Sequence, residues 1–327
     1  LGTASDPYMS REKIKLLRPD VLTLDIEMPR MSGLAFLERL MRLRPMPVVM
    51  VSSLTERYAE TTLRALELGA VDYIAKPKAG SQQSLSEYGE ELANKIRAAA
   101  ATDVGYIQSL DKTWLSRAQA PPAGTLQNPM GAEKRVIAIG ASTGGTEAIR
   151  EVLTQFPDSM PPILIVQHMP EFFTPMFARR LDQSCRLKVA EAQHDEPALL
   201  GRAYIAPGHS HMELVRVAGQ YRIRLSQRSL VNRHRPSVDV LFWSVASVAA
   251  DHGLGIILTG MGQDGAAGLV AMREASAYTI AQDEKSSVIF GMPRTAIELG
   301  GATEILPLRQ IGQKVLTYLN TVVPAVN

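Results

Sequence analysis

The stretch Val136-Ile-Ala-Ile-Gly-Ala-Ser-Thr-Gly-Gly-Thr146 is a short apolar run that ends in a glycine-rich turn. Its first residues are apolar and rich in β-branched side chains, which is typical of a buried parallel strand. From Thr146 to Leu153 the apolar side chains recur at helical spacing. This order of strand, turn and helix predicts an α/β fold built on a parallel sheet.

Ser142 lies in this turn, directly after the strand. A hydroxyl beside the unpaired N–H groups and the positive end of a helix dipole is well placed to act as a nucleophile, because both stabilise a nearby oxyanion. Serine is also a preferred helix N-cap, so the junction by itself is more often a structural cap than a catalytic site. The Gly-x-Ser-x-Gly spacing around Ser142 is too short a pattern to decide between these interpretations.

Two further apolar strands end in polar residues. The stretch Pro162-Ile-Leu-Ile-Val-Gln-His-Met-Pro170 ends in His168, and Gly253-Leu-Gly-Ile-Ile-Leu-Thr-Gly-Met-Gly-Gln-Asp-Gly265 ends in a glycine-rich loop with Asp264. The carboxyl ends of parallel strands share one edge, where ligands bind. We therefore expect a Ser-His-Asp catalytic triad, in a chain order that differs from that of the α/β-hydrolases.

These segments, together with Arg235-Pro-Ser-Val-Asp239 and Gln282-Asp-Glu-Lys-Ser-Ser-Val-Ile-Phe-Gly-Met-Pro293, closely resemble the CheB family of chemotaxis protein-glutamate methylesterases. The resemblance covers nearly the whole chain from residue 133 onward. It implies that Ser142, His168 and Asp264 form the triad and that the backbone N–H of Met261 is an oxyanion donor. It also implies hydrolysis of glutamyl methyl esters on chemoreceptors and deamidation of receptor glutamines, with no cofactor for the esterase.

The N-terminal part contains three more strands with polar ends. Asp25 ends one strand, Ser52 and Ser53 end the next, and Lys76 ends the third. This pattern resembles a response-regulator receiver domain of flavodoxin-like fold. The resemblance implies that Asp25 accepts a phosphoryl group from a chemotaxis histidine kinase, that Ser52 is the switch hydroxyl, with Ser53 as the alternative, and that Lys76 is the counter-ion. It also implies inhibition by the receiver and activation by phosphorylation.

A receiver domain normally begins with a strand that carries an acidic pair for Mg²⁺. The chain instead begins at Leu1 with what looks like the end of a second strand, followed by a predicted helix from Tyr8 to Leu17. We therefore expect the first strand and helix, about 30 residues, to be missing from this sequence. Mg²⁺ is expected for receiver phosphorylation, with metal ligands that this chain leaves unknown.

Composition agrees with two cytoplasmic domains. The chain has 327 residues, 46% of them apolar, a net charge of +2 and one cysteine. These values argue against nucleic-acid binding and a disulfide framework, and Cys185 is interpreted as a packed small side chain. No apolar run is long enough for membrane insertion. We predict a receiver domain over 1–100, a linker over 101–132 that is rich in Pro and Gly, and a catalytic domain over 133–327.

Other features have weaker signals. The stretch from His211 to Leu225 predicts a hairpin that turns at Gly219 and extends the main sheet with antiparallel strands. The basic residues Arg233, His234 and Arg235 are equally typical of a receptor-binding patch and of an ordinary solvated cluster. The remaining histidines have no metal-ligand spacing and are expected to be packed or exposed; they are His194, His209, His211, His234 and His252.

Two other functions fit parts of the pattern. A nucleotide-binding module would also have a glycine-rich turn before a helix, but the run lacks a Gly-Lys-Ser/Thr ending. A transcriptional regulator would need a compact basic helix that reads DNA, and the C-terminal α/β pattern does not contain one. Methyl-ester hydrolysis is therefore the preferred prediction.

Overall fold

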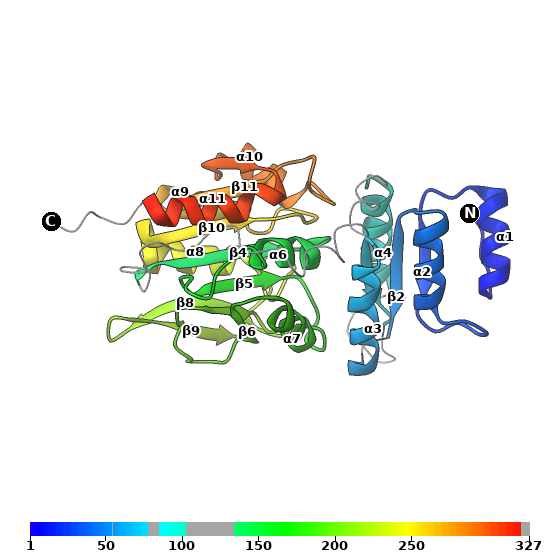
Figure 1. The fold of residues 1–327 in the computed structure, drawn as a ribbon, viewed down its shortest axis with the longest axis horizontal. Helices are drawn as coiled ribbons and strands as arrows, with labels where there is room; N and C mark the ends of the chain where they lie inside the picture. The colour runs from blue at the N-terminus through cyan, green and yellow to red at the C-terminus, as the bar shows by residue number, and fades with distance from the viewer. Residues whose placement is uncertain (54, 78–84, 103–133, 322–327) are drawn as a thin grey trace. The chain divides into compact units, whose positions relative to one another are not determined.

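The computed structural model describes residues 1–53, 55–77, 85–102 and 134–321 of the chain. The chain divides into two compact units, Leu1–Gln119 and Ala120–Asn327 (Figure 1). Most of the linker that was predicted over 101–132 lies outside the described residues. Among those that are described, no helix is long and apolar enough to cross a bilayer.

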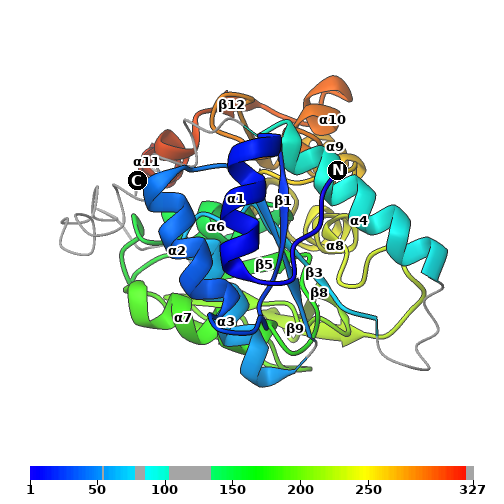
Figure 2. The ribbon, with the colours of Figure 1, turned by 90° about the vertical axis from the view of Figure 1, so that its right-hand side faces the viewer.

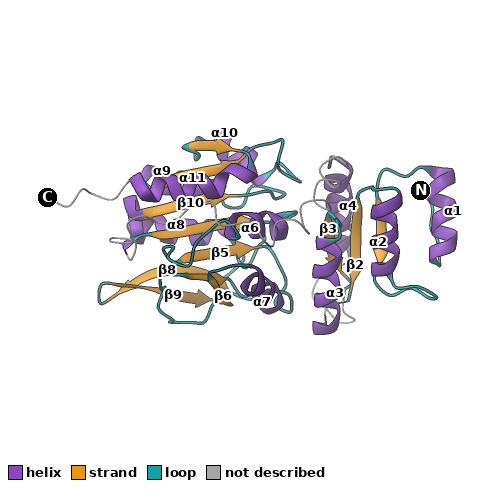
Figure 3. Ribbon diagram, viewed as in Figure 1, coloured by secondary structure: helices purple, strands orange, loops and turns teal. Residues whose placement is uncertain are grey.

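Helices and strands alternate in the first unit (Figure 3). They are α1 (Pro7–Leu17), β1 (Leu22–Asp25), α2 (Gly33–Leu43), β2 (Val48–Ser52), α3 (Glu56–Glu67), β3 (Asp72–Ala75) and α4 (Leu85–Ala100). The strands pair in parallel in the order β1-β2-β3. The parallel register brings the ends of β1, β2 and β3, and with them Asp25, Ser52 and Lys76, to one edge of the sheet.

Helix α1 begins where the sequence predicts a helix. The Asp6 carboxylate caps it by accepting hydrogen bonds from the N–H groups of Tyr8 and Met9, each at 2.9 Å. Pro7 occupies the first turn, where its missing N–H costs nothing. Helices α1 and α2 lie side by side (Figures 1 and 2), and Arg44 at the end of α2 donates a hydrogen bond to the Ile14 carbonyl.

The second unit is a seven-stranded sheet with helices on both faces. Its elements are β4 (Val136–Ala141), α6 (Gly145–Leu153), β5 (Ile163–Gln167), α7 (Thr174–Ser184), β6 (Lys188–Glu191), β7 (Arg202–Ile205), β8 (His211–Val217), β9 (Gln220–Ser226), α8 (Val238–Ala249), β10 (Gly253–Ile257), α9 (Ala266–Glu274), β11 (Tyr278–Gln282), α10 (Met292–Glu298), β12 (Glu304–Leu306) and α11 (Leu308–Thr321). Every pair of neighbouring strands in the order β12-β11-β10-β4-β5-β7-β6 is parallel. The predicted α/β fold is confirmed.

The strand order places a topological switch point beside β4. The chain moves from β4 to β5 on one side and later returns to β10 on the other side. The residues of β4 are buried on both faces: Val136 and Ala138 belong to the cluster that contains α8, and Ile137 and Ile139 are fully buried too. In such sheets, ligands bind at the carboxyl ends of the strands that flank the switch point.

The hairpin is present but does not extend the main sheet. Strands β8 and β9 form a separate antiparallel pair that turns at Ala218 and Gly219, both with positive φ. The hairpin packs against α8, where the Leu214 N–H donates to the Ser244 hydroxyl at 2.9 Å. The predicted sheet extension is therefore wrong, because β8 and β9 pair with each other and not with a strand of the main sheet, while their apolar face packs on α8.

Candidate active site

Ser142 and His168 follow two neighbouring parallel strands. Ala141 of β4 pairs with Gln167 of β5 as the last residues in register. The His168 N–H continues the ladder by donating to the Ala141 carbonyl at 3.1 Å, and the Ser142 N–H donates to Thr259 after β10 at 3.0 Å. Backbone hydrogen bonds therefore hold the ends of β4, β5 and β10 together.

His168 and Asp264 form a buried pair. The ring Nε2 of His168 lies 2.8 Å from Oδ2 of Asp264, and their side chains are 8% and 1% exposed. Because a carboxylate only accepts, Nε2 carries the proton in this contact. The other ring nitrogen, Nδ1, is buried and has no hydrogen-bond partner, which leaves its lone pair available to a proton donor.

The Ser142 hydroxyl does not donate a hydrogen bond to His168 Nδ1, since Nδ1 has no partner. Catalytic hydrogen bonds are often long or misaligned before the substrate binds, so this geometry is compatible with Ser142 as a nucleophile and His168 as its general base. Ser142 and His168 also share Gln167, whose Nε2 donates to both of their carbonyls, at 2.9 and 3.2 Å. The main chain at the two strand ends is thereby tied together.

Asp264 lies at the N-terminus of α8. Its carboxylate accepts hydrogen bonds from the Val238 N–H at 2.7 Å, the Ser237 hydroxyl at 2.7 Å and Asn232 Nδ2 at 2.8 Å. Burial alone would raise the pKa of Asp264, but the hydrogen bond and electrostatic interaction with His168, together with the hydrogen bonds from Asn232 and Ser237, outweigh it and hold the pKa well below its usual value. Asp264 therefore remains a carboxylate.

Two glycines allow the N-terminus of α8 to lie close to β4 and to the Asp264 carboxylate. A Cβ atom at Gly140 of β4 would lie 2.1 Å from Val238 Cγ1, and one at Gly265 would lie 2.4 Å from the same atom. Val238 thus fits between the two glycines. This packing brings the first N–H groups of α8 to the Asp264 carboxylate.

A second carboxylate, Asp239, lies next to Asp264. Asp239 is buried and accepts from Asn232 Nδ2 and from the Gly268 N–H, each at 2.6 Å. Burial raises the pKa of Asp239, and the neighbouring charge of Asp264 raises it further. The Asn232 amide therefore links two buried carboxyl groups whose pKa values are shifted in opposite directions, upward for Asp239 and downward for Asp264.

The loop with Met261 runs against Ser142. A Cβ atom at Gly260 would lie 2.8 Å from Ser142 Cβ, so only glycine permits this close approach. Gly262 has φ +89°, a conformation that favours glycine. No hydrogen bond from the Met261 N–H is found among the described residues, which leaves it free to serve as the predicted donor.

The three basic residues have different environments. Arg235 donates to the carbonyls of Gln227 and Arg228, at 3.1 and 2.9 Å. The His234 ring stacks on His168 with centroids 3.7 Å apart. Arg233 is exposed, whereas His234 and Arg235 are half-buried. The cluster is therefore not a uniform surface patch.

Sequence reasoning missed the residues that surround the His168–Asp264 pair, namely Asn232, His234, Ser237 and Asp239. Part of this segment stood out only through the family resemblance. Nothing in the residue types indicates that a stacked ring and a bridging amide converge on Asp264 and His168. His211 was expected to be either packed or exposed, and it is fully buried.

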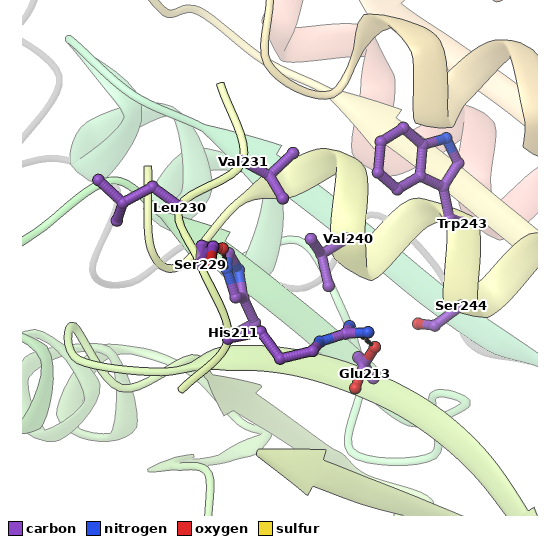
Figure 4. A pocket seen from close by; sticks show the side chains of 9 residues that line it. His211, Glu213, Ser229, Leu230, Val231, Val240, Trp243 and Ser244 are labelled. Atoms are coloured by element: carbon purple, nitrogen blue, oxygen red, sulfur yellow. Dashed lines mark hydrogen bonds and ion pairs between the residues drawn. The ribbon is translucent and has the colours of Figure 1, made fainter. Parts of the chain in front are cut away.

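A pocket of about 770 Å³ lies between the hairpin, the loop that follows it and α8 (Figure 4). It is lined by residues of the hairpin, the following loop and α8, which are His211, Glu213, Arg228, Ser229, Leu230, Val231, Val240, Trp243 and Ser244. His211 connects it to the site, because its Nδ1 accepts from the Ser237 N–H at 3.2 Å and its Nε2–H donates to the Ser229 carbonyl at 3.0 Å.

The receiver unit brings Asp25 and Lys76 together. Lys76 Nζ lies 2.5 Å from Asp25 Oδ2, and both side chains are 37% exposed. The other Asp25 oxygen accepts from the Glu27 N–H at 3.0 Å. Ser52 is buried, and its hydroxyl accepts from Thr62 at 2.8 Å. The structure thus places a lysine, but not the Ser52 hydroxyl, directly on the Asp25 carboxylate.

The acidic groups beside Asp25 do not complete a magnesium site. Glu27 is the nearest further carboxylate in the chain, and it accepts a hydrogen bond from Tyr58. No group of three His, Cys, Asp or Glu side chains is placed to hold an ion within the described parts of the chain. The requirement for Mg²⁺ stays a prediction of the resemblance, and no step below passes through the ion.

Comparison with known proteins places both units. The CheB methylesterase family model matches residues 137–315, and the response regulator receiver domain model matches residues 1–86. A protein-glutamate methylesterase/protein-glutamine glutaminase of Burkholderia lata is 56% identical over 98% of this chain and 88% of its own length, and one of Paraburkholderia xenovorans is 56% identical over 98% and 89%.

A solved structure agrees with the second unit. The Thermotoga maritima CheB methylesterase catalytic domain is 36% identical, with a TM-score of 0.55, and the match covers 56% of this chain and 98% of that domain. Both the receiver match and the full-length relatives agree with the resemblance drawn from the sequence. The chain belongs to the CheB family, in which a response-regulator receiver domain precedes a methylesterase domain.

Proposed function

We propose that this chain hydrolyses glutamyl methyl esters on chemoreceptors and deamidates receptor glutamines. The observation that carries the proposal is the buried His168–Asp264 pair, which leaves His168 Nδ1 unpartnered at the strand ends beside Ser142. The printed names of the relatives from Burkholderia lata and Paraburkholderia xenovorans describe both reactions. The Ser142, His168 and Asp264 triad is the catalytic group in this proposal.

The first half-reaction forms an acyl-enzyme. His168 Nδ1 takes the proton of the Ser142 hydroxyl while the oxygen attacks the carbonyl carbon of the ester. The Met261 N–H stabilises the oxyanion, aided by the N-terminus of α6. Asp264 stabilises the imidazolium, which then gives its proton to the leaving methoxide. Methanol departs.

The second half-reaction releases glutamate. His168 takes a proton from water, and the resulting hydroxide attacks the acyl carbon. The bond to Ser142 breaks, and its oxygen recovers a proton from His168. A glutamine side chain follows the same route, except that ammonia leaves in place of methanol. Protein groups and water supply every proton, so no cofactor is needed for this step.

Methanol release from methylated receptor membranes tests the triad. Ser142→Ala and His168→Ala are expected to lower kcat by roughly 10⁶-fold, and Asp264→Asn by roughly 10⁴-fold. His252→Ala is the matched control, because His252 precedes β10 at its amino end and is paired with Asp251. Undiminished turnover by the Ser142 variant, with the control unchanged, would exclude this mechanism.

We further propose that the receiver unit controls the esterase. A chemotaxis histidine kinase supplies the phosphoryl group to Asp25, and the Lys76 ammonium neutralises part of the added charge. The Ser52 hydroxyl then exchanges its Thr62 partner for a phosphoryl oxygen, which favours an active state. Without phosphorylation, the receiver inhibits the esterase. The Asp25–Lys76 ion pair supports this assignment.

A further inference from the structure

The loop from Val231 to Arg235 contacts both partners of the buried pair. Its Asn232 amide donates to Asp264, and its His234 ring stacks on His168. We propose that this loop is a positioning clamp that holds the general base in its reactive orientation, with His234 and Asn232 as positioning residues. The proposal rests on the proposed function, because it concerns the base of that reaction.

The backbone of the loop is built for this placement. Val231 and His234 close a tight turn with two backbone hydrogen bonds, at 3.1 and 2.8 Å. The two residues between them, Asn232 and Arg233, have φ values of 51° and 67°. Asparagine tolerates this left-handed conformation, whereas arginine rarely adopts it. Such strain persists where the surrounding structure demands it, often at functional sites.

The stacked His234 ring restricts a motion of the His168 ring that the hydrogen bond to Asp264 permits. The Nε2–H bond to Asp264 fixes one direction in the plane of the His168 ring, but the ring can still rock about that axis. His234 lies over the face of the ring, with a centroid separation of 3.7 Å and an interplanar angle of 12°. Contact across a whole face opposes this rocking. Nδ1 thus stays directed toward the position of the reacting proton.

Asn232 acts on the other partner. Its single amide nitrogen has two hydrogens, and it donates to Asp264 Oδ1 at 2.8 Å and to Asp239 Oδ2 at 2.6 Å. This bridge holds Oδ1 of Asp264, so that Oδ2 remains for His168. One loop therefore fixes the carboxylate through an amide and the imidazole through a ring face.

The test compares His234→Ala with His234→Phe in the full-length protein. We expect His234→Ala to lower kcat for methanol release by roughly tenfold to a hundredfold, with KM within about twofold, because a small misplacement of the base slows only the chemical step. A phenyl ring restores a flat stacking face, so His234→Phe is expected to recover most of kcat. His252→Ala is again the control.

A spectroscopic signature and a second background make the test specific. In protein labelled with ¹⁵N-histidine, His234→Ala is expected to shift or broaden the Nε2–H signal of His168, and His234→Phe to leave it near its original position. In an Asp264→Asn background, His234→Ala is expected to cost less than in the wild type, because the base is already poorly held.

Three results would overturn the clamp. They are a wild-type kcat and His168 signal in His234→Ala, an equally slow His234→Phe variant that retains the fold by circular dichroism, and full additivity with Asp264→Asn. Failure of the proposed function has a different result, since Ser142→Ala would then remain active. An inactive Ser142 variant beside a fully active His234→Ala variant rejects the clamp alone.

Discussion

Asp264 is a carboxylate that the protein keeps ionised although its side chain is only 1% exposed. Its neighbour Asp239 is also buried, yet its pKa is shifted in the opposite direction. The difference comes from the donors. Asp264 accepts from His168, Ser237 and the first turn of α8, whereas Asp239 has fewer partners and faces the charge of Asp264.

The two carboxylates predict opposite effects of pH on stability. A lowered pKa in the folded state means that ionised Asp264 stabilises the fold above its unfolded pKa of about 4, and that this contribution is lost as the pH falls. The difference in unfolding free energy between wild type and Asp264→Asn should therefore be constant at neutral pH and shrink as the pH falls below about 4. Urea denaturation at several pH values measures it.

Asp239→Asn serves as the matched control for this experiment. Its raised pKa gives a contribution that is fully present below the unfolded pKa and is lost as the pH rises through the folded pKa. The difference between wild type and Asp239→Asn should thus become smaller with increasing pH. Equal pH trends for the two variants would contradict the charge states assigned here.

At the scale of elements, the turn between β4 and α6 determines where Ser142 lies. Gly144 is the N-cap of α6 with φ +76°, and Gly145 follows it as the first helical residue. A Cβ atom at Gly145 would lie 2.1 Å from Gln167 Oε1 and 2.7 Å from Ala141 Cβ. The turn therefore depends on the missing side chain at Gly145, because Gln167 ties the strand ends together in that space.

Gly145→Ala is expected to damage both stability and activity. The added methyl group displaces Gln167 from the strand ends, which should cost about 1–3 kcal/mol of unfolding free energy and lower kcat. Urea denaturation and methanol release measure the two effects. The control is Gly89→Ala. Gly89 lies in helix α4, where no atom is near the new methyl group, so this substitution should stabilise the helix slightly. A Gly145 variant as active and stable as wild type would refute this packing argument.

For the whole molecule, the prediction concerns the effect of one unit on the other. A fragment that begins near Glu133 should have higher basal esterase activity than the full-length, unphosphorylated protein, because it lacks the receiver that we propose to be inhibitory. The fragment matches a domain that forms a structure alone in the Thermotoga maritima relative. Methanol release at equal enzyme concentration makes the comparison.

Activation should require the receiver and Asp25. An acyl phosphate donor with Mg²⁺ is expected to increase the activity of the full-length protein, but not that of the fragment or of an Asp25→Asn variant. Equal basal rates for fragment and full-length protein would exclude inhibition by the receiver. Activation of the Asp25 variant would assign the phosphoryl group to another residue.

Local patterns in the sequence were sufficient for the α/β fold and for the candidates at the strand ends. Apolar runs of strand length, each followed by a polar residue, predicted β4, β5 and β10 together with Ser142, His168 and Asp264. This succeeds because parallel strands bring their carboxyl ends to one edge whatever the loops between them do. The receiver strands were recognisable for the same reason.

Only the tertiary structure decided what surrounds these residues. His168 and Asp264 are 96 residues apart in the chain, and the clamp residues Asn232 and His234 come from a loop with no strand or helix pattern. Their roles depend on where that turn packs against the sheet. The hairpin was misplaced for a related reason, since alternation shows which face of β8 and β9 is buried but not which strands their edges pair with.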